Sequence, residues 1–363
     1  MRLTARLLIL CLTLFSLPSF AETLGNLYQV HEPVASQQPD ERNAGLTRAL
    51  QTLVLRLTGN ASAAQSPALA GYFKDPQQLI SQYGFENGPP MALVVDFDPT
   101  ATDNALRQAG LPVWGASRPS VLAWWLNESA NGSSLVGDSQ EASAPLNRAA
   151  QRRGLPLRLP IADLSEQQVG TAENLNAAQP DALKSASERY GADALLAVDA
   201  KEADGKWTAT WRVWMGASRE QGQAQGDTPD ALADAVMLGV SQRLSQRFVG
   251  SAGSASAQVL QIEGADLARY AEVSRLLEPM GAKLVEVQGN RLVYRVTASP
   301  EQLRAQLALA RLQEAPAEPR NRRSTPMANR CRTRPCRRRT PCASTGNEPC
   351  GGGQSPASRR RWL

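Results

Sequence analysis

Cysteine and histidine are almost absent from the central part of this 363-residue chain. Residues 22–318 contain no cysteine and a single histidine, His31. The missing cysteines exclude thiol nucleophiles, thiolate metal sites and disulfide frameworks from this part of the chain. One histidine leaves little scope for imidazole acid–base chemistry. The composition therefore points to no reaction, and it predicts no cofactor and no metal site.

Apolar runs long enough to cross a bilayer are also missing. Arg2 and Arg6 precede an apolar segment at residues 7–17 (LLILCLTLFSL), and residues 19–21 (SFA) have the small residues of a cleavage site. We therefore predict a signal peptide at residues 1–21, cleaved after Ala21, and a periplasmic protein without a transmembrane span after cleavage. A retained membrane anchor is the alternative interpretation.

Positive charge is scarce outside the C-terminal end. The chain has a net charge of +5, but residues 319–363 hold 12 arginines and one acid, and the signal segment holds two arginines. Residues 22–318 therefore carry a net charge of −8. The basic pI belongs to the tail, so no nucleic-acid partner is predicted for the folded body.

The tail at residues 315–363 is predicted to be disordered, because it is rich in Arg, Pro and Cys and has almost no apolar residue. Its four cysteines lack the C-x-x-C spacing of structural zinc sites, and in an oxidising compartment they allow three disulfide pairings. The abrupt change in composition also fits out-of-frame translation. Both explanations stay open.

The remaining sequence predicts an α+β protein of two or three small units with mixed or antiparallel sheets and packed helices. We place an N-terminal αβ domain at residues 22–127, a polar linker at 128–144 and a second αβ domain at 145–249. A Ser/Gly linker follows at residues 250–257. Residues 258–314 form a third unit whose predicted βαββα order resembles part of a ferredoxin-like sandwich.

One motif favours an enzyme. An apolar strand leads into DFDPT at residues 96–100, which resembles the first motif of haloacid-dehalogenase-type phosphatases. That resemblance implies Asp96 as nucleophile, Asp98 as general acid/base and a magnesium ion. Lys184, with Asp199 and Asp204, would complete the site. The competing interpretation is structural: Asp98 precedes Pro-Thr as a helix N-cap does, and Asp204-Gly is typical of a hairpin turn.

Tryptophan and arginine indicate a binding surface. Strand alternation places Trp207, Ala209, Trp211 and Val213 on one face of residues 207–215, which is typical of a core. Arg212 and Trp214 lie on the opposite face and are candidates for contact with a partner. Trp124 and Trp125 are neighbours, so they must point to opposite sides of their strand. We expect one of the two to be the less buried, and we include both in the candidate binding surface.

Several segments together resemble a known exported family. The run LYQVHEPVASQQPDERNAGLTRALQTLVLRLTG and the later segments ALVVDFD, LPVWGASRPSVLAWW and GADALLAVDAKEADGKWTATWRVW are similar to the proteobacterial family called domain of unknown function 2066 (DUF2066). The resemblance covers residues 22–249 and implies export to the periplasm. The family has no assigned activity, so the resemblance implies no catalytic residue.

The sequence thus predicts a non-catalytic binding or accessory protein of the bacterial cell envelope. Its expected partner is an envelope protein or peptidoglycan. A magnesium-dependent phosphatase with Asp96 as nucleophile is the alternative.

Overall fold

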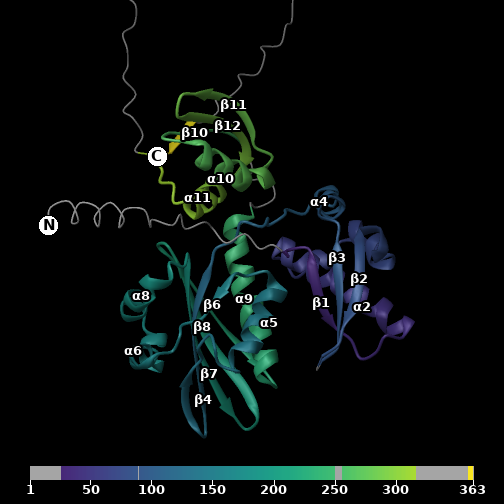
Figure 1. Ribbon diagram of the computed structural model, residues 1–363, viewed down its shortest axis with the longest axis vertical. Helices are drawn as coiled ribbons and strands as arrows, with labels where there is room; N and C mark the ends of the chain where they lie inside the picture. Colours follow the sequence, from purple (N-terminus) through teal and green to yellow (C-terminus); the bar gives the residue numbers. More distant parts are fainter. Residues whose placement is uncertain (1–25, 89, 250–255, 316–358, 363) are drawn as a thin grey trace, which may run out of the picture.

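The described part of the chain forms three sheets (Figure 1). Each sheet packs on a hydrophobic core of its own, and the second sheet has a core on both faces. The structure is a computed structural model and describes residues 26–88, 90–249, 256–315 and 359–362. The predicted α+β class, with small mixed or antiparallel sheets and packed helices, is confirmed. The predicted signal peptide, residues 250–255 of the predicted linker and most of the tail lie outside the described residues.

The first unit is an antiparallel sheet with the strand order β1-β3-β2, covered by the long helix α2. Helix α2 forms because its leucines recur at helical spacing; Leu46, Leu50 and Leu53 are all buried. It ends at Gly59, whose left-handed conformation (φ 63°) closes the last turn. The elements are β1 (Gln29–Pro33), α2 (Pro39–Thr58), α3 (Ala70–Lys74), β2 (Ile80–Glu86), β3 (Ala92–Phe97) and α4 (Pro99–Gln108).

The second unit is a sheet with the order β5-β4-β7-β8-β9, and the short β6 also pairs with β4. Helices α5 and α9 cover one face, and α6, α7 and α8 cover part of the other (Figure 1). The strands are β4 (Val121–Ser129), β5 (Gly132–Leu135), β6 (Leu157–Arg158), β7 (Ala194–Ala203), β8 (Lys206–Met215) and β9 (Ser218–Gly226). The helices are α5 (Ser143–Arg153), α6 (Leu164–Val169), α7 (Ala172–Asn176), α8 (Asp181–Ser187) and α9 (Pro229–Phe248).

The boundary between the first two units differs from the sequence-based expectation. Strand β4 was assigned to the domain at residues 22–127, but it pairs in parallel with β7 at the centre of the second sheet. The expected linker at 128–144 contains β5 and the start of α5. The physical reason is that β4 is buried on both faces from Val121 to Leu126, and only a sheet with helices on both sides can cover such a strand.

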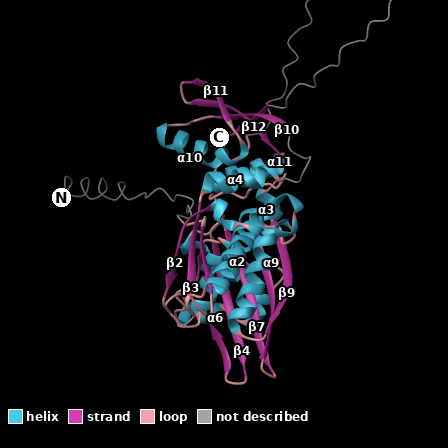
Figure 2. Ribbon diagram, turned by 90° about the vertical axis from the view of Figure 1, so that its right-hand side faces the viewer, coloured by secondary structure: helices cyan, strands magenta, loops and turns pink. Residues whose placement is uncertain are grey.

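The third unit has the predicted βαββα order and the sheet order β11-β12-β10-β13. Its elements are β10 (Ser256–Ile262), α10 (Leu267–Leu277), β11 (Lys283–Gln288), β12 (Arg291–Ala298), α11 (Pro300–Leu309) and β13 (Arg359–Trp362). It lies at one end of the molecule, with α11 next to α9 (Figures 1 and 2).

Strand β13 corrects the prediction of a disordered tail for its last residues. It pairs in parallel with β10, and the side chain of Trp362 is buried in the third core. Burial of the large indole ring removes apolar surface from water, which favours the pairing of this segment with β10. Residues 316–358, which include the four tail cysteines, lie outside the described residues.

Buried arginines join the first two units. Arg56 on α2 donates to the carbonyl oxygen of Arg152 on α5 at 3.0 Å. Arg118, just before β4, is fully buried and donates to backbone carbonyls of both units. Between them these side chains satisfy carbonyl groups at the ends of α2 and α5, which have no partner within their own helices.

No helix in the described part of the chain is both long enough and apolar enough to cross a membrane.

Candidate functional site

The second sheet presents a polar face on β8 and β9, beside α7 and α8. Cross-strand pairing sets its side chains in four rows, because residues paired in register point to the same side. From one end to the other, the rows are Leu195–Trp214–Arg219, Ala197–Arg212–Gln221, Asp199–Thr210–Gln223 and Lys201–Thr208–Gln225. We call this surface the β8–β9 face. It holds two pockets, one at each end.

The Trp214 pocket lies at the first row and has a volume of about 560 Å³. Trp214 and Arg219 line it from the sheet, and Lys184 and Glu188 line it from the side of α8. The indole Nε1 of Trp214 is buried and has no hydrogen-bond partner among the described residues. A buried N–H without an acceptor is costly, so this donor is available to a ligand or an ordered water.

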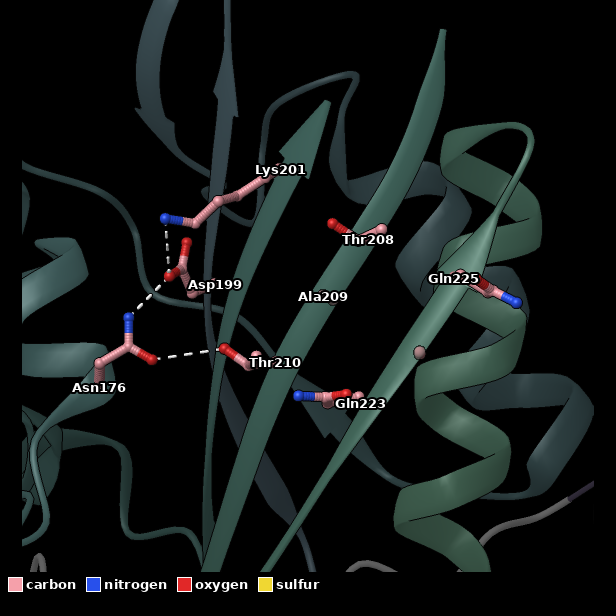
Figure 3. A pocket seen from close by; sticks show the side chains of 9 residues that line it. Asn176, Asp199, Lys201, Thr208, Ala209, Thr210, Gln223 and Gln225 are labelled. Carbon is pink, nitrogen blue, oxygen red and sulfur yellow. Dashed lines mark hydrogen bonds and ion pairs between the residues drawn. The ribbon is translucent and has the colours of Figure 1, made fainter. Parts of the chain in front are cut away.

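The polar pocket lies at the third and fourth rows, with a volume of about 650 Å³ (Figure 3). Asp199 lines this pocket and is 3% exposed. Its Oδ2 accepts from Asn176 at 2.6 Å and lies 3.4 Å from the ammonium of Lys201. Its Oδ1 is buried and has no partner within the described part of the chain. The pocket thus contains one unsatisfied, charged hydrogen-bond acceptor.

Asn176, the last residue of α7, joins the polar pocket to Arg212 in the adjacent row. Its side-chain oxygen accepts from Arg212 at 2.7 Å and from Thr210 at 3.3 Å, while its amide donates to Asp199. Burial and the nearby charge of Arg219 lower the pKa of Arg212, and the Asp199 carboxylate opposes that shift. Asn176 therefore fixes side chains of the second and third rows. It holds Arg212 over the sheet rather than in solvent.

Two of the four predicted surface residues lie on the β8–β9 face, and two do not. Arg212 and Trp214 are there, each half-buried. Trp124 and Trp125 point to opposite sides of β4, but both are buried, at 0% and 2% exposure. Neither is the less buried partner that we expected, because helices cover the sheet on both sides of β4. They are core residues.

The phosphatase constellation is not assembled. Asp96 lies on β3 in the antiparallel first sheet, and its two oxygens accept from Gln29 and Gln82, each at 2.8 Å. Asp98 caps α4, accepting from the backbone N–H of Ala101 at 2.6 Å. Two of its expected companions, Lys184 and Asp199, belong to the second unit and lie in different pockets. The third, Asp204, is in the β7–β8 turn.

Sequence reasoning missed most of the polar pocket. Strand β9 was not predicted, since SREQGQAQG lacks the β-branched and aromatic residues typical of strands. The alternation of Arg219, Gln221, Gln223 and Gln225 with smaller residues was the available signal. Asn176 could not have been found from the sequence, because its role depends on where α7 packs against β7.

No group of three or more His, Cys, Asp or Glu side chains within the described ranges could hold a metal ion.

Fold and site together define an α+β protein with a two-pocket polar sheet face. Residues 21–115 are similar to a family described as Domain of unknown function (DUF8605). This match corrects the resemblance to domain of unknown function 2066, which is a different family. It ends before β4, so the β8–β9 face lies outside it. No curated protein and no solved structure matches the chain.

Proposed function

We propose that this chain is a non-catalytic binding or accessory protein of the bacterial cell envelope, working in the periplasm after removal of residues 1–21. The observation that carries the proposal is the β8–β9 face, where three buried polar atoms, Trp214 Nε1, Asp199 Oδ1 and Arg212 Nε, lack partners among the described residues. Trp214 and Asp199 line separate pockets of this surface. The export signal in the sequence supports the location.

The composition of this face favours binding. Tryptophan and arginine are the residue types most enriched where binding energy is concentrated. Trp214 is half-buried in a pocket, and Arg212 is held by Asn176, so neither loses much side-chain freedom when a partner binds. A site whose side chains are already positioned spends less of its binding energy on ordering them.

In-cell photo-crosslinking tests the proposal. A photoreactive amino acid replaces Gln221, which is exposed on β9 between the two pockets, in the full exported protein. Gln51, an exposed glutamine on α2, is the matched control position. We expect a recurrent adduct from position 221, either with an envelope protein or with lysozyme-sensitive peptidoglycan, and none from position 51.

Trp214→Ala should abolish that adduct while leaving the far-UV circular dichroism spectrum unchanged. If position 221 gave no adduct, or the same adducts as position 51, the proposal that this face binds a partner would be wrong.

The absence of catalysis is tested separately. Purified mature protein with Mg²⁺ is assayed on p-nitrophenyl phosphate beside Asp96→Asn. We expect no hydrolysis above the protein-free rate from either protein. Hydrolysis by the wild type that the Asp96→Asn substitution removed would contradict a non-catalytic role.

A further inference from the structure

The polar pocket has features that specify a class of ligand. We propose that it is a subsite for an uncharged, polyhydroxylated glycan segment, with the free oxygen of Asp199 as the acceptor for sugar hydroxyl groups. This inference rests on the proposed binding function and names the ligand of one part of the same face.

The first argument is the state of Asp199. Its side chain is almost completely buried, yet only Oδ2 is engaged, by Asn176 and Lys201. An unpaired oxygen of a buried carboxylate costs free energy unless a donor meets it. Figure 3 shows this carboxylate between Asn176 and Lys201 at the edge of the polar pocket. Asp199 lines the pocket, and a small rotation of its carboxylate brings the unpaired Oδ1 to a hydrogen-bond donor of a bound molecule.

The second argument is the balance of charge. Lys201 Nζ lies 3.1 Å from Glu128 and 3.4 Å from Asp199. The hydrogen bond to Glu128 and the charge of Asp199 raise the pKa of Lys201, which stays protonated at neutral pH. Asp199 and Lys201 are the charged residues that line the polar pocket, one acid and one base. A strongly anionic or cationic ligand would meet no net opposite charge, so a neutral polar ligand fits best.

The third argument is the chemistry of the remaining lining. Thr208, Thr210, Gln223 and Gln225 stand in two rows on adjacent strands. Hydroxyl and amide groups both donate and accept hydrogen bonds. Such a lining matches the alternating hydroxyl, ring-oxygen and acetamido groups of a sugar chain better than the single charge of a phosphate or an amine.

The fourth argument is the position of Trp214 on the same face as the polar pocket. Trp214 lies on the same strand side as Thr210, four residues and about 13 Å further along β8. Trp214 lines the second pocket of the face. A glycan that filled the polar pocket and extended along β8 would reach this half-buried aromatic ring.

Two uncharged envelope glycan chemistries share these groups, and the experiment separates them. Isothermal titration calorimetry on the purified mature protein uses a neutral N-acetylglucosamine oligomer, with acetamido groups, in one arm and a neutral glucose oligomer, with hydroxyl groups alone, in the other. We expect saturable binding in one arm. Binding in that arm identifies the glycan chemistry, and no binding in either arm overturns the proposal.

Variants connect the binding to the pocket. Asp199→Asn should weaken binding about tenfold or more, because a hydrogen bond to a charged acceptor is lost. Asp204→Asn, at the exposed β7–β8 turn, is the matched control and should bind as the wild type does. Gln223→Ala is a second test, since an exposed side chain can be removed without loss of folding. We expect the Gln223→Ala variant to bind the glycan several-fold more weakly than the wild type does.

The outcomes separate this inference from the proposed function. If Asp199→Asn remains folded and, like Gln223→Ala, binds as tightly as wild type, the subsite is wrong. If position 221 crosslinks to an envelope protein while neither glycan binds, the subsite is wrong and the binding function stands. If glycan binding depends on Asp199, the subsite is supported even when no protein adduct forms.

Discussion

Arg118 donates a hydrogen bond from Nη2 to the carbonyl oxygen of Arg56 over 2.7 Å, although the two arginines belong to different units of the protein. The guanidinium of Arg118 also lies over the indole of Trp114, 4.1 Å from the ring centroid. All five of its hydrogen bonds go to backbone carbonyls, and burial lowers its pKa. Backbone dipoles rather than a carboxylate stabilise this buried charge, so the contact depends on the exact placement of α2 against α5.

Arg118→Lys should destabilise the protein strongly. An ammonium has three donors and cannot replace a planar fork that reaches five carbonyl oxygens. We expect the free energy of unfolding to fall by about 3 kcal/mol. Guanidinium denaturation followed by tryptophan fluorescence measures the loss. Arg107→Lys, at an exposed ion pair with Asp103, is the control and should change stability by less than about 0.5 kcal/mol. Equal effects would contradict the structural role of Arg118.

Gly154→Ala should disturb the contacts of Arg118 and Arg56 that join the first two units, because Gly154 follows α5 and lies against both arginines. Gly154 has a φ of 65°, and a Cβ atom there would lie 2.9 Å from Nη1 of Arg118 and 3.0 Å from Arg56. Gly191 has a similar φ of 59° but no atom within 4 Å of its Cβ position. Gly191→Ala therefore reports backbone strain alone, about 1 kcal/mol.

We expect Gly154→Ala to cost at least about 1 kcal/mol more than Gly191→Ala, because overpacking adds to strain. Denaturant midpoints of the two variants give the comparison. If Gly154→Ala lost less stability than this, Arg118 and Arg56 would be able to move away from the added methyl group.

The raised pKa of Tyr28 should lower the stability of the folded protein above pH 10. Its hydroxyl donates to Asp103 at 2.7 Å, and burial together with this contact raises its pKa above the ordinary value of 10. Above pH 10 the unfolded chain releases the phenolic proton while the folded protein keeps it, so the unfolded state binds fewer protons and stability falls as pH rises. Below pH 10 both states are protonated and this contribution is fully present.

Tyr28→Phe should therefore weaken the decline in urea midpoint between pH 10 and pH 11, while lowering the midpoint at pH 8 through the lost hydrogen bond. Tyr83→Phe, at a 39% exposed tyrosine on β2, is the control and should leave the decline unchanged. An identical decline for wild type and Tyr28→Phe would remove Tyr28 as its cause.

Trp362→Ala should destabilise the third unit. The ring is 3% exposed within the third core, and the Trp362 carbonyl accepts from the backbone N–H of Glu263 at 2.9 Å. Removing a buried tryptophan costs about 3–5 kcal/mol. Hydrogen exchange at the amides of β10 should become much faster in this variant.

Leu267→Ala is the matched control, since it removes a large apolar side chain that is 81% exposed on α10. It should leave exchange in β10 unchanged. Slow exchange in β10 of Trp362→Ala would mean that β13 does not protect that edge of the sheet.

The sequence by itself was sufficient for elements whose pattern is local. The leucine spacing and Gly59 are enough to account for α2, and Ser299-Pro300 accounts for the start of α11. The Asp204-Gly205 turn between alternating strands accounts for the β7–β8 hairpin. Periodicity, turn chemistry and helix caps depend on neighbours a few residues apart. The acidic body and its lack of cysteine are also properties of the sequence alone.

The tertiary structure decided everything that depends on distant residues. It placed β4 in the second sheet, buried both Trp124 and Trp125, and positioned Trp362 beside β10. It also brought Asn176 to Asp199, 23 positions away, and left one oxygen of that carboxylate unpaired within the described chain. Burial and pairing of this kind arise from packing between elements, and no local pattern encodes which strand becomes a neighbour or which polar group stays unsatisfied.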